Sequence, residues 1–427
     1  MPGAAQSASD DSVSPERLHA DVEALVGFGT RHTLSVQDDP DRGIGAALRW
    51  GDRQFWTISQ ACGGCLTIAT PEKMVSGDRI TVPVHLSDLV AIQRGSERPD
   101  EVVIVQAHID SRVSDVMDAT SDAPGANDDG SGVALVLEAA RVLSQRRYPT
   151  TIVYALLSGE EQGLYGGQLL ADYAAAQGWT VKAVLNNDIV GGSCGSDGYC
   201  DADHVRVFSE GPRADGDDAL RASVRRNGGE NDNPSRSLSR FVSGLGDDAL
   251  AVRQVWRTDR MGRGGDQIPF LDKGYPAIRF SVAIENYDRQ HQDLRTENGV
   301  SYGDTIDAMD FPYLARVTRL NIRMLDALAR APMPPAPKVE AAVQTFTKVS
   351  WEPVPGAESY SIWRRRTDSP AWEAEPVVKS TAATEAKLDG VRGDDWFVGV
   401  SALAADGSEG PIASAVPGGA FAPLGRE

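Results

Sequence analysis

Residues 124–132 read Pro-Gly-Ala-Asn-Asp-Asp-Gly-Ser-Gly, a glycine-rich turn that carries the adjacent carboxylates of Asp128 and Asp129. The apolar residues that follow, at 133–143, recur at the spacing of one helix face. The turn therefore predicts a carboxylate held at the start of a helix. Because glycine lets the backbone bend sharply and approach other groups closely, we expect this turn to lie against a functional site.

Predicted strands that end in polar side chains flank this turn. The strands lie at 102–107, 151–157 and 181–186. The polar residues that follow them, in chain order, are His108, Asp110, Glu160, Glu161 and Asp188. Strands that alternate with helices predict an α/β fold with a mixed, largely parallel sheet flanked by helices. Binding sites in such sheets form beyond the carboxyl ends of the strands, where all these side chains lie.

Composition and charge exclude two classes of function. The chain of 427 residues has a formal net charge of −19, which argues against nucleic-acid binding because phosphate recognition needs a cationic surface. No apolar run is long enough to cross a bilayer, so no transmembrane segment is predicted. The length suits a soluble protein of two domains. No oligomeric state is predicted.

The four cysteines form two close pairs, Cys62 with Cys65 and Cys194 with Cys200. An even count in tight pairs favours two local disulfides and an oxidising compartment. A four-cysteine zinc site fits the first spacing but not the second, and free thiols are the remaining alternative. The first residues lack the apolar segment of a signal peptide, so the chain is either cytosolic or has lost its signal. Together with the disulfides, this favours a secreted or periplasmic protein.

Further helices and strands surround the core. Helices are predicted at 14–28, 43–50, 165–177 and 311–330. Strands are predicted at 55–58, 65–69, 80–86, 89–93, 204–208 and 277–283. Residues 191–265 are otherwise irregular, with helical runs at 219–226 and 237–245, and we expect this segment to form loops over the site.

A change of pattern divides the chain near residue 331. Residues 331–338 are rich in proline and predict a stiff linker, and the short alternating strands beyond it predict an all-β sandwich. Three motifs of this last segment resemble a fibronectin type III module: Trp-Glu-Pro at 351–353, Tyr-Ser-Ile-Trp at 360–363 and Gly-Ser-Glu-Gly-Pro at 407–411. We therefore predict a first domain at 1–330, a linker at 331–338 and the module at 339–427.

The side chains at the strand ends suit a pair of metal ions. Two ions about 3.5 to 4 Å apart polarise a carbonyl and lower the pKa of a shared water, provided that a group bridges them. A carboxylate has two oxygens and can bridge, so we assign Asp128 as the bridge. We assign His108 and Asp188 as ligands. Asp110, two positions after His108 on the same side of an extended chain, is assigned to orient its ring.

Glu160 and Glu161 have different predicted roles, because adjacent residues of an extended chain point to opposite sides. We assign Glu161 as a metal ligand and Glu160 as the general base that takes a proton from the metal-bound water. A second histidine is required among the six of the chain. His291 follows the last predicted strand of the α/β unit, where the site should lie, and His204 is its main competitor.

Each of these features alone is more often structural. An isolated His-x-Asp is usually a structural contact, a pair of glutamates is usually a solvated helix start, and Asp128 with Asp129 would be a helix cap and its neighbour. Their succession in the chain, each at the end of a predicted strand, favours a metal hydrolase.

Four motifs, at 108–111, 124–132, 159–166 and 187–188, closely resemble, together with His291, the secreted di-zinc aminopeptidases of the bacterial leucyl aminopeptidase type. The resemblance covers residues 15–330. It implies two zinc ions that share Asp128. The implied zinc pairs are His108 with Asp188 and Glu161 with His291. The resemblance also implies Glu160 as the catalytic base, in agreement with the assignment made from the residues.

The chain departs from the family pattern at two places. Some members have a tyrosine directly before the last histidine, where this chain has Gln290, and Tyr287 lies earlier. The family also often has Asp-His where this chain has Asp266 and Gln267. We retain Asp266, Tyr287 and Arg263 as candidate substrate-binding residues.

The expected function is that of an aminopeptidase, a metallo-exopeptidase that hydrolyses the first peptide bond of peptides or proteins with a free N-terminus. A water bridged by two zinc ions attacks the first carbonyl, with Glu160 as general base and the substrate amine held by site carboxylates. A carboxypeptidase or dipeptidase on the same fold, which would need cations for the substrate carboxylate, is one alternative. A glutaminyl cyclase, which works with one zinc ion, is another. Glu160 argues against a non-catalytic adhesion protein, because a structural site needs no base.

Overall fold

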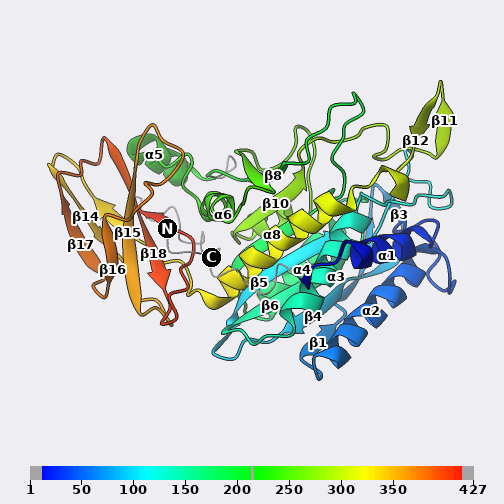
Figure 1. Ribbon diagram of the computed structural model, residues 1–427, viewed down its shortest axis with the longest axis horizontal. Helices are drawn as coiled ribbons and strands as arrows, with labels where there is room; N and C mark the ends of the chain where they lie inside the picture. The colour runs from blue at the N-terminus through cyan, green and yellow to red at the C-terminus, as the bar shows by residue number, and fades with distance from the viewer. Residues whose placement is uncertain (1–11, 213–215, 416–427) are drawn as a thin grey trace.

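An eight-stranded sheet forms the centre of the computed structural model, which describes residues 12–212 and 216–415 (Figure 1). The strand order is β1-β4-β6-β5-β7-β10-β8-β9. In this order the strands are Leu66–Ala69, Leu89–Gln93, Thr150–Leu157, Arg98–His108, Thr180–Asn187, Ala277–Val282, His204–Ser209 and Ala251–Val255. The strands β6, β5, β7 and β10 run parallel, and antiparallel pairs occur only toward the two sides of the sheet. The predicted mixed, largely parallel sheet is confirmed.

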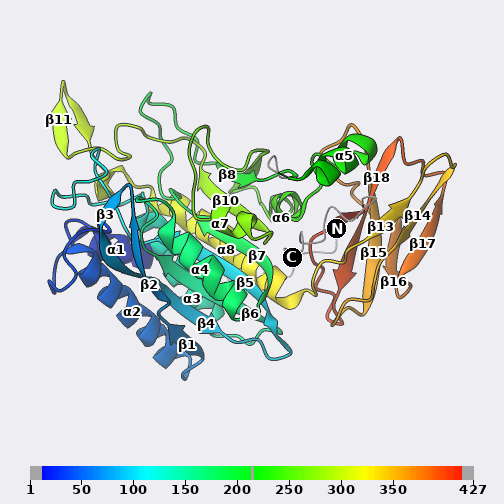
Figure 2. The same cartoon turned by 180° about the vertical axis from the view of Figure 1, so that it is seen from behind.

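Helices cover both faces of this sheet, as a parallel sheet requires. Alternate residues of β5 belong to two cores, with Val103 and Val105 in one and Val102 and Ile104 in the other. The first face is covered by α1 (Pro15–Val26), α2 (Gly43–Ala61), α3 (Gly130–Leu143), α6 (Pro234–Ser243) and α8 (Phe311–Arg330). The second face is covered by α4 (Tyr165–Ala176) and α7 (Ile268–Asp272), which are labelled in the opposite view of Figure 2.

Two predictions about secondary structure are wrong. Residues 55–58, predicted as a strand, belong to α2, where Phe55 and Ile58 lie about one turn apart and are both buried. A short apolar run suits either element, and packing decides between them. The segment 191–265 is not simply a set of loops over the site, because its strands β8 and β9 extend the central sheet. Its helix α5 (Asp218–Asn227) and α6 are near the predicted positions. The sequence does not reveal β9, because Arg253 and Gln254 interrupt its apolar residues. This strand lies at the edge of the sheet and pairs only with β8.

Smaller elements complete this part of the chain. They are the hairpin of β2 (Glu72–Gly77) and β3 (Ile80–Ser87), the hairpin of β11 (Arg295–Glu297) and β12 (Val300–Tyr302), and the short helix η2 (Ile306–Ala308). In the described part of the chain, no helix combines the length and apolarity that crossing a membrane requires.

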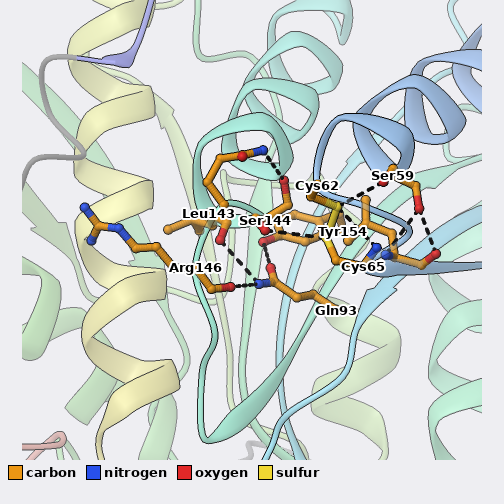
Figure 3. The surroundings of a disulfide bond; sticks show 10 residues. Ser59, Cys62, Cys65, Gln93, Leu143, Ser144, Arg146 and Tyr154 are labelled. Carbon is orange, nitrogen blue, oxygen red and sulfur yellow. Dashed lines mark hydrogen bonds between the residues drawn. A yellow bond between two sulfur atoms is a disulfide. The ribbon is translucent and has the colours of Figure 1, made fainter.

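Both predicted cysteine pairs form disulfides, Cys62–Cys65 and Cys194–Cys200. The first lies between the end of α2 and the start of β1 (Figure 3). Beside it, the hydroxyl of Ser59 donates to the carbonyl of Leu66 and accepts from its amide. Gln93 of β4 donates to the carbonyl of Arg146 at 2.7 Å, and Tyr154 of β6 donates to Gln93 at 2.8 Å. These bonds fasten this side of the sheet to the turn that follows α3.

The chain after α8 forms two antiparallel sheets. One contains β13 (Lys338–Glu340), β14 (Phe346–Ser350) and β17 (Glu385–Asp389). The other contains β15 (Ser359–Arg366), β16 (Val378–Thr381), β18 (Trp396–Leu403) and β19 (Ala413–Ala415). Trp351, Ile362 and Val400 belong to the separate core that these strands bury. The predicted all-β architecture is confirmed, and the fibronectin type III assignment stays a prediction.

A buried carboxylate joins these sheets to the rest of the protein. Asp232 lies just before α6, and Arg365 of β15 donates to its two oxygens through Nη2 at 2.5 and 2.6 Å. Ser414 donates to Asp232 at 2.8 Å, and Nη1 of Arg240 lies 3.7 Å from it. Asp232 and Arg365 are both almost completely buried. The two charges therefore compensate each other in the buried interior.

Replacing Arg365 with alanine should lower the free energy of unfolding by about 3 to 5 kcal/mol, because Asp232 would stay buried without its main counter-charge. Urea denaturation followed by circular dichroism measures this loss. The matched control is Arg366→Ala, an exposed arginine next in the same strand, which should have little effect. A loss in Arg365→Ala no larger than that of the control would contradict the role given to this ion pair.

The carboxyl end of α8 is held by two cations. Nζ of Lys182, at the start of β7, donates to the carbonyls of Leu328 at 3.1 Å and Ala331 at 2.7 Å. Arg98 also donates to the Ala331 carbonyl, at 3.3 Å. Cations suit this end of a helix because its last carbonyls have no partners within the helix. Burial, against the effect of Glu101, lowers the pKa of Lys182 to about 8.

This lowered pKa makes stability depend on pH between about 8 and the ordinary lysine value of 10.5. In that range the unfolded chain keeps a proton that the folded chain has released, so this residue raises the free energy of unfolding by about 1.4 kcal/mol per pH unit. In Lys182→Met, denaturation curves measured across this range should show a slope smaller by that amount. Lys379→Met, on the exposed side of β16, is the control and should keep the wild-type slope. Equal slopes in both variants would refute this assignment.

Candidate metal centre

The strands β5, β6 and β7 and helix α3 bring predicted ligands to the same edge of the sheet. His108 ends β5, Glu161 lies after β6 and Asp188 follows β7. Asp128 lies just before the start of α3. The fifth predicted ligand, His291, lies on the loop after β10. The φ angle of His291 is 53°, a left-handed conformation that is uncommon outside glycine and clusters at functional sites.

Asp129 joins three of these segments beneath the site. Its Oδ1 accepts from the amide of Gly132 at 3.0 Å, which caps α3, and from the amide of Ile189 at 3.3 Å. Its Oδ2 accepts from the amide of His108 at 3.2 Å. Burial raises the pKa of Asp129 well above its ordinary value. Asp129 therefore holds the start of α3, the end of β5 and the segment after β7 in one arrangement.

Asp128 lies between the two predicted histidine ligands. Its Oδ1 is 3.1 Å from Nε2 of His108, and its Oδ2 is 3.0 Å from Nε2 of His291. Gln290 also donates to Oδ2 at 3.0 Å. Burial opposes the charge of Asp128, but the two histidines hold its pKa well below the ordinary value. Each carboxylate oxygen thus faces a different histidine, as a bridging carboxylate requires.

One group of possible metal ligands contains His108, Glu160 and Asp188, whose ligand atoms lie within 4.8 Å of one another. Nδ1 of His108 faces the backbone oxygen of Asp110 at 3.1 Å and its carboxylate at 3.5 Å, so the hydrogen bond is to the backbone, and the orienting role of the carboxylate stays a prediction. Oδ1 of Asp188 is 4.0 Å from Nε2 of His108. The same oxygen is 2.7 Å from Nη2 of the fully buried Arg279.

A second group contains Asp128, Glu161 and His291, with ligand atoms again within 4.8 Å. Oε1 of Glu161 lies 3.0 Å from Nε2 of His291, yet this buried oxygen accepts no hydrogen bond. A buried oxygen without a donor is the kind of atom that a cation satisfies. Burial disfavours the charged ring, but the carboxylates of Glu161 and Asp128 raise the pKa of His291 to about 10.

Glu160 and Glu161 belong to different groups of possible ligands, although residues 158–163 form a bend and a turn and not the extended chain assumed from the sequence. Glu161 is 5% exposed, whereas part of Glu160 is open to solvent. Asp110 holds both, because its Oδ1 accepts from the amide of Glu160 at 3.3 Å and its Oδ2 from the amide of Glu161 at 3.2 Å. Burial of the carboxyl group, with the charge of Glu161 and against that of His108, raises the pKa of Glu160 well above its ordinary value. A carboxyl group with a raised pKa is suited to accept a proton.

The donor set fits zinc. Imidazole nitrogens and carboxylate oxygens are ligands that zinc takes in proteins, and the unpartnered Oε1 of Glu161 is an oxygen that a cation would satisfy. The cysteines play no part, since all four are in disulfides. The number of ions and the role of each residue stay predictions.

The remaining candidates are placed less uniformly. His204 belongs to neither group, because its Nδ1 pairs with Asp201 at 2.9 Å. Asp266 is 1% exposed, and its Oδ1 accepts from the amide of Gly167, so its carboxylate is buried. Arg263 pairs with Glu285 at 2.7 Å, and Tyr287 is 62% exposed. Their proposed contacts with substrate stay predictions.

Several residues around the ligands are missed by sequence reasoning. Asp304 accepts from the amides of Asn127 and Asp128 and holds the turn, and burial raises the pKa of Asp304 to about 7. Nothing in its local sequence marks this role. A signal for Arg279 does exist, because it is the one charged residue of the mostly apolar strand β10. Arg112 directly follows the His108 motif, and its spacing there is the only local signal.

Comparison with known proteins agrees with this geometry. Residues 88–324 match the sequence model of peptidase family M28. This chain belongs to peptidase family M28. A probable zinc metalloprotease of Pyricularia oryzae is 40% identical to it, covering 98% of this chain and 86% of the relative. The chain is thus an M28 zinc metalloprotease, and the family resemblance read from its motifs is confirmed at this level.

Solved structures share the fold of this M28 peptidase. An aminopeptidase from Aneurinibacillus sp. strain AM-1 has a TM-score of 0.52 and 14% identity, covering 75% of this chain and 95% of that one. A glutaminyl cyclase from Porphyromonas gingivalis has a TM-score of 0.50 and 17% identity, covering 74% of this chain and 98% of that one. At such identities the likeness concerns the fold alone, and the fold carries both chemistries.

The role of Asp129 can be tested by Asp129→Ala. We expect the free energy of unfolding to fall by about 2 to 4 kcal/mol, because a cap is lost and two further buried amides lose their acceptor. Asp217→Ala is the matched control, since Asp217 caps α5 and accepts only from Leu220 among the described contacts. The control should lose about 1 kcal/mol. Equal losses, measured by urea denaturation, would show that Asp129 is only a cap.

Proposed function

We propose that this M28 peptidase is an aminopeptidase that binds two zinc ions, one held by His108 and Asp188 and the other by Glu161 and His291. The observation that carries the proposal is the position of Asp128, whose two oxygens face the two histidines at 3.1 and 3.0 Å. A carboxylate in that position can serve both ions.

The proposed roles of the protein's own groups follow from their contacts. Zinc, when bound, activates water and polarises the substrate carbonyl. Glu160 takes the proton from the attacking water and delivers it to the nitrogen of the leaving group. Asp110 keeps Glu160 in place through the backbone and orients His108 through its ring. The free amine of the substrate is held by carboxylates of the site, which makes a free N-terminus the expected requirement.

A carboxypeptidase is a second candidate because cations lie close to the site. Nη2 of Arg260 is 4.0 Å from Oδ2 of Asp188, and Arg263 of the same loop keeps 30% of its side chain exposed. Both arginines pair with Glu285, at 3.4 and 2.7 Å, so their charge is partly compensated. The glutaminyl cyclase alternative is less well supported, because five ligands for two ions exceed what a one-zinc site needs.

We also propose the division of the chain into a peptidase domain at 1–330, a linker at 331–338 and a fibronectin type III-like module at 339–427. Supporting it, α8 ends at Arg330 and β13 begins at Lys338. We propose that the module serves placement or stability, and that the protein is secreted or periplasmic. The two disulfides are compatible with such a compartment.

The exopeptidase proposal is tested with three substrates on the zinc-loaded full chain: leucyl-anilide, its N-acetylated form, and a peptide with a free N-terminus and an amidated C-terminus. The first and third should be cleaved, and the N-acetylated one should not. A carboxypeptidase would leave the amidated peptide intact. Metal analysis should give two zinc ions per chain, and chelation should abolish activity until zinc is restored.

The proposed base is tested by Glu160→Gln, which should lower kcat by about 10² to 10⁴-fold, because the amide cannot take the proton. Zinc content should stay at the wild-type value if Glu160 is a base rather than an essential ligand. Glu97→Gln, on the exposed segment before β5, is the control and should keep wild-type activity. Full activity in Glu160→Gln would sink the mechanism.

A further inference from the structure

The two histidines of the candidate metal centre differ in what faces their second ring nitrogen. Nδ1 of His108 lies against acceptors, the backbone oxygen of Asp110 at 3.1 Å and its carboxylate at 3.5 Å. Nδ1 of His291 lies against a donor, Nη2 of Arg112, at 2.7 Å. The two histidines that face Asp128 therefore differ in the group that contacts Nδ1, an acceptor at His108 and a donor at His291.

Arg112 contacts both residues that accompany Asp128 in the second group. Its Nε donates to Oε2 of Glu161 at 2.9 Å while Nη2 contacts His291. Its side chain is 17% exposed, and Nη1 donates to the carbonyl of Val113 at 3.3 Å. Ser114, two residues after Arg112, donates to the carboxylate of Asp293 at 2.7 Å. The Arg112 segment is thus fastened to the loop that carries His291.

The acceptor at His108 and the donor at His291 have opposite effects on metal binding. A neutral imidazole has one N–H and one lone pair. Acceptors at Nδ1 of His108 place the proton there and leave the lone pair on Nε2, which is the usual arrangement of a metal ligand. A metal ion binds only the neutral ring. An arginine can only donate, so in the neutral form of His291 its contact takes up the lone pair at Nδ1 and leaves the proton on Nε2, the atom that faces Asp128 and Glu161. A cation at Nε2 must therefore compete with Arg112.

Charge acts in the same direction. Among the described contacts, Glu161 is the only carboxylate that pairs with Arg112. At the other position, Arg279 and Arg260 both lie near Asp188, but Arg279 also pairs with Asp259 at 3.2 Å and Arg260 with Glu285 at 3.4 Å. The guanidinium charges near His108 are thus shared with Asp259 and Glu285, whereas that near His291 is opposed by Glu161 alone. Like charges at short range repel, so a metal ion beside Glu161 meets the stronger repulsion.

We propose that Arg112 makes the Glu161–His291 position the weaker of the two zinc positions. This inference rests on the proposed two-zinc function. Arg112 is in this sense a positioning residue, since it acts on the ligands and not on the substrate. A simple orienting role for Arg112 makes the opposite prediction, because loss of an orienting contact would weaken the second ion.

The test measures zinc bound per full-length chain as a function of buffered free zinc, starting from chelator-treated protein. The wild type should fill in two separated steps. In Arg112→Gln the second step should move to lower free zinc by about 10-fold or more, the size of effect that groups around metal ligands exert. The first step should not move. Arg112→Lys, which keeps the charge, should keep the weak second step.

Arg79→Gln is the matched control. Nη1 of Arg79 donates to the backbone oxygen of Glu161 at 3.0 Å, so it is an arginine near the same residue that touches no ligand atom. Both its zinc steps should match the wild type. A second step in Arg112→Gln that is unchanged or moves to higher free zinc overturns the inference. Two equal steps in the wild type also overturn it and leave the two-zinc centre standing. A chain that never takes a second ion, with or without Arg112, contradicts the two-zinc centre itself.

Discussion

Three segments that are distant in the sequence meet at the buried carboxylate of Asp129. It accepts from the amides of His108, Gly132 and Ile189, so hydrogen-bond length sets the distances between β5, α3 and the segment after β7. The glycine at 132 is required by this closeness, because a Cβ there would lie 2.3 Å from the carbonyl oxygen of Asn187. One acid of the pair supports the fold, and its neighbour Asp128 is thereby presented to the candidate metal centre.

Compensation of charge is the second constraint. The edge of the sheet gathers more carboxylates than a buried site can hold as free anions, since an unpaired buried charge is strongly destabilising. Arginines compensate part of this negative charge: Arg279 pairs with Asp188 and Asp259, and Arg112 pairs with Glu161. One oxygen of Glu161 accepts no hydrogen bond, so the arginines do not satisfy every carboxylate oxygen of the site. The metal chemistry of the M28 family thus fits a deficit that the fold itself creates.

The C-terminal sheets are joined to this arrangement by similar means. The ion pair of Asp232 and Arg365 is buried at the border with α6, and α6 packs on the face of the sheet beside β8 and β10. Close by, Lys182 and Arg98 hold the last carbonyls of α8 where the chain leaves the α/β part. The orientation of the C-terminal sheets therefore depends on buried charges and not on the proline-rich segment alone.

The sequence by itself determined the order of elements and the local placement of the strand-end residues, because periodicity and glycine-rich turns are properties of neighbouring residues. It indicated that the turn at 124–132 holds a carboxylate at the start of a helix. Only the tertiary structure decided that Arg112 reaches His291, that Asp304 holds the turn at 124–132, that β8 and β9 belong to the central sheet, and that residues 55–58 are helical. The physical reason is that such contacts join segments far apart in the chain, whose meeting depends on how strands cross over and helices pack.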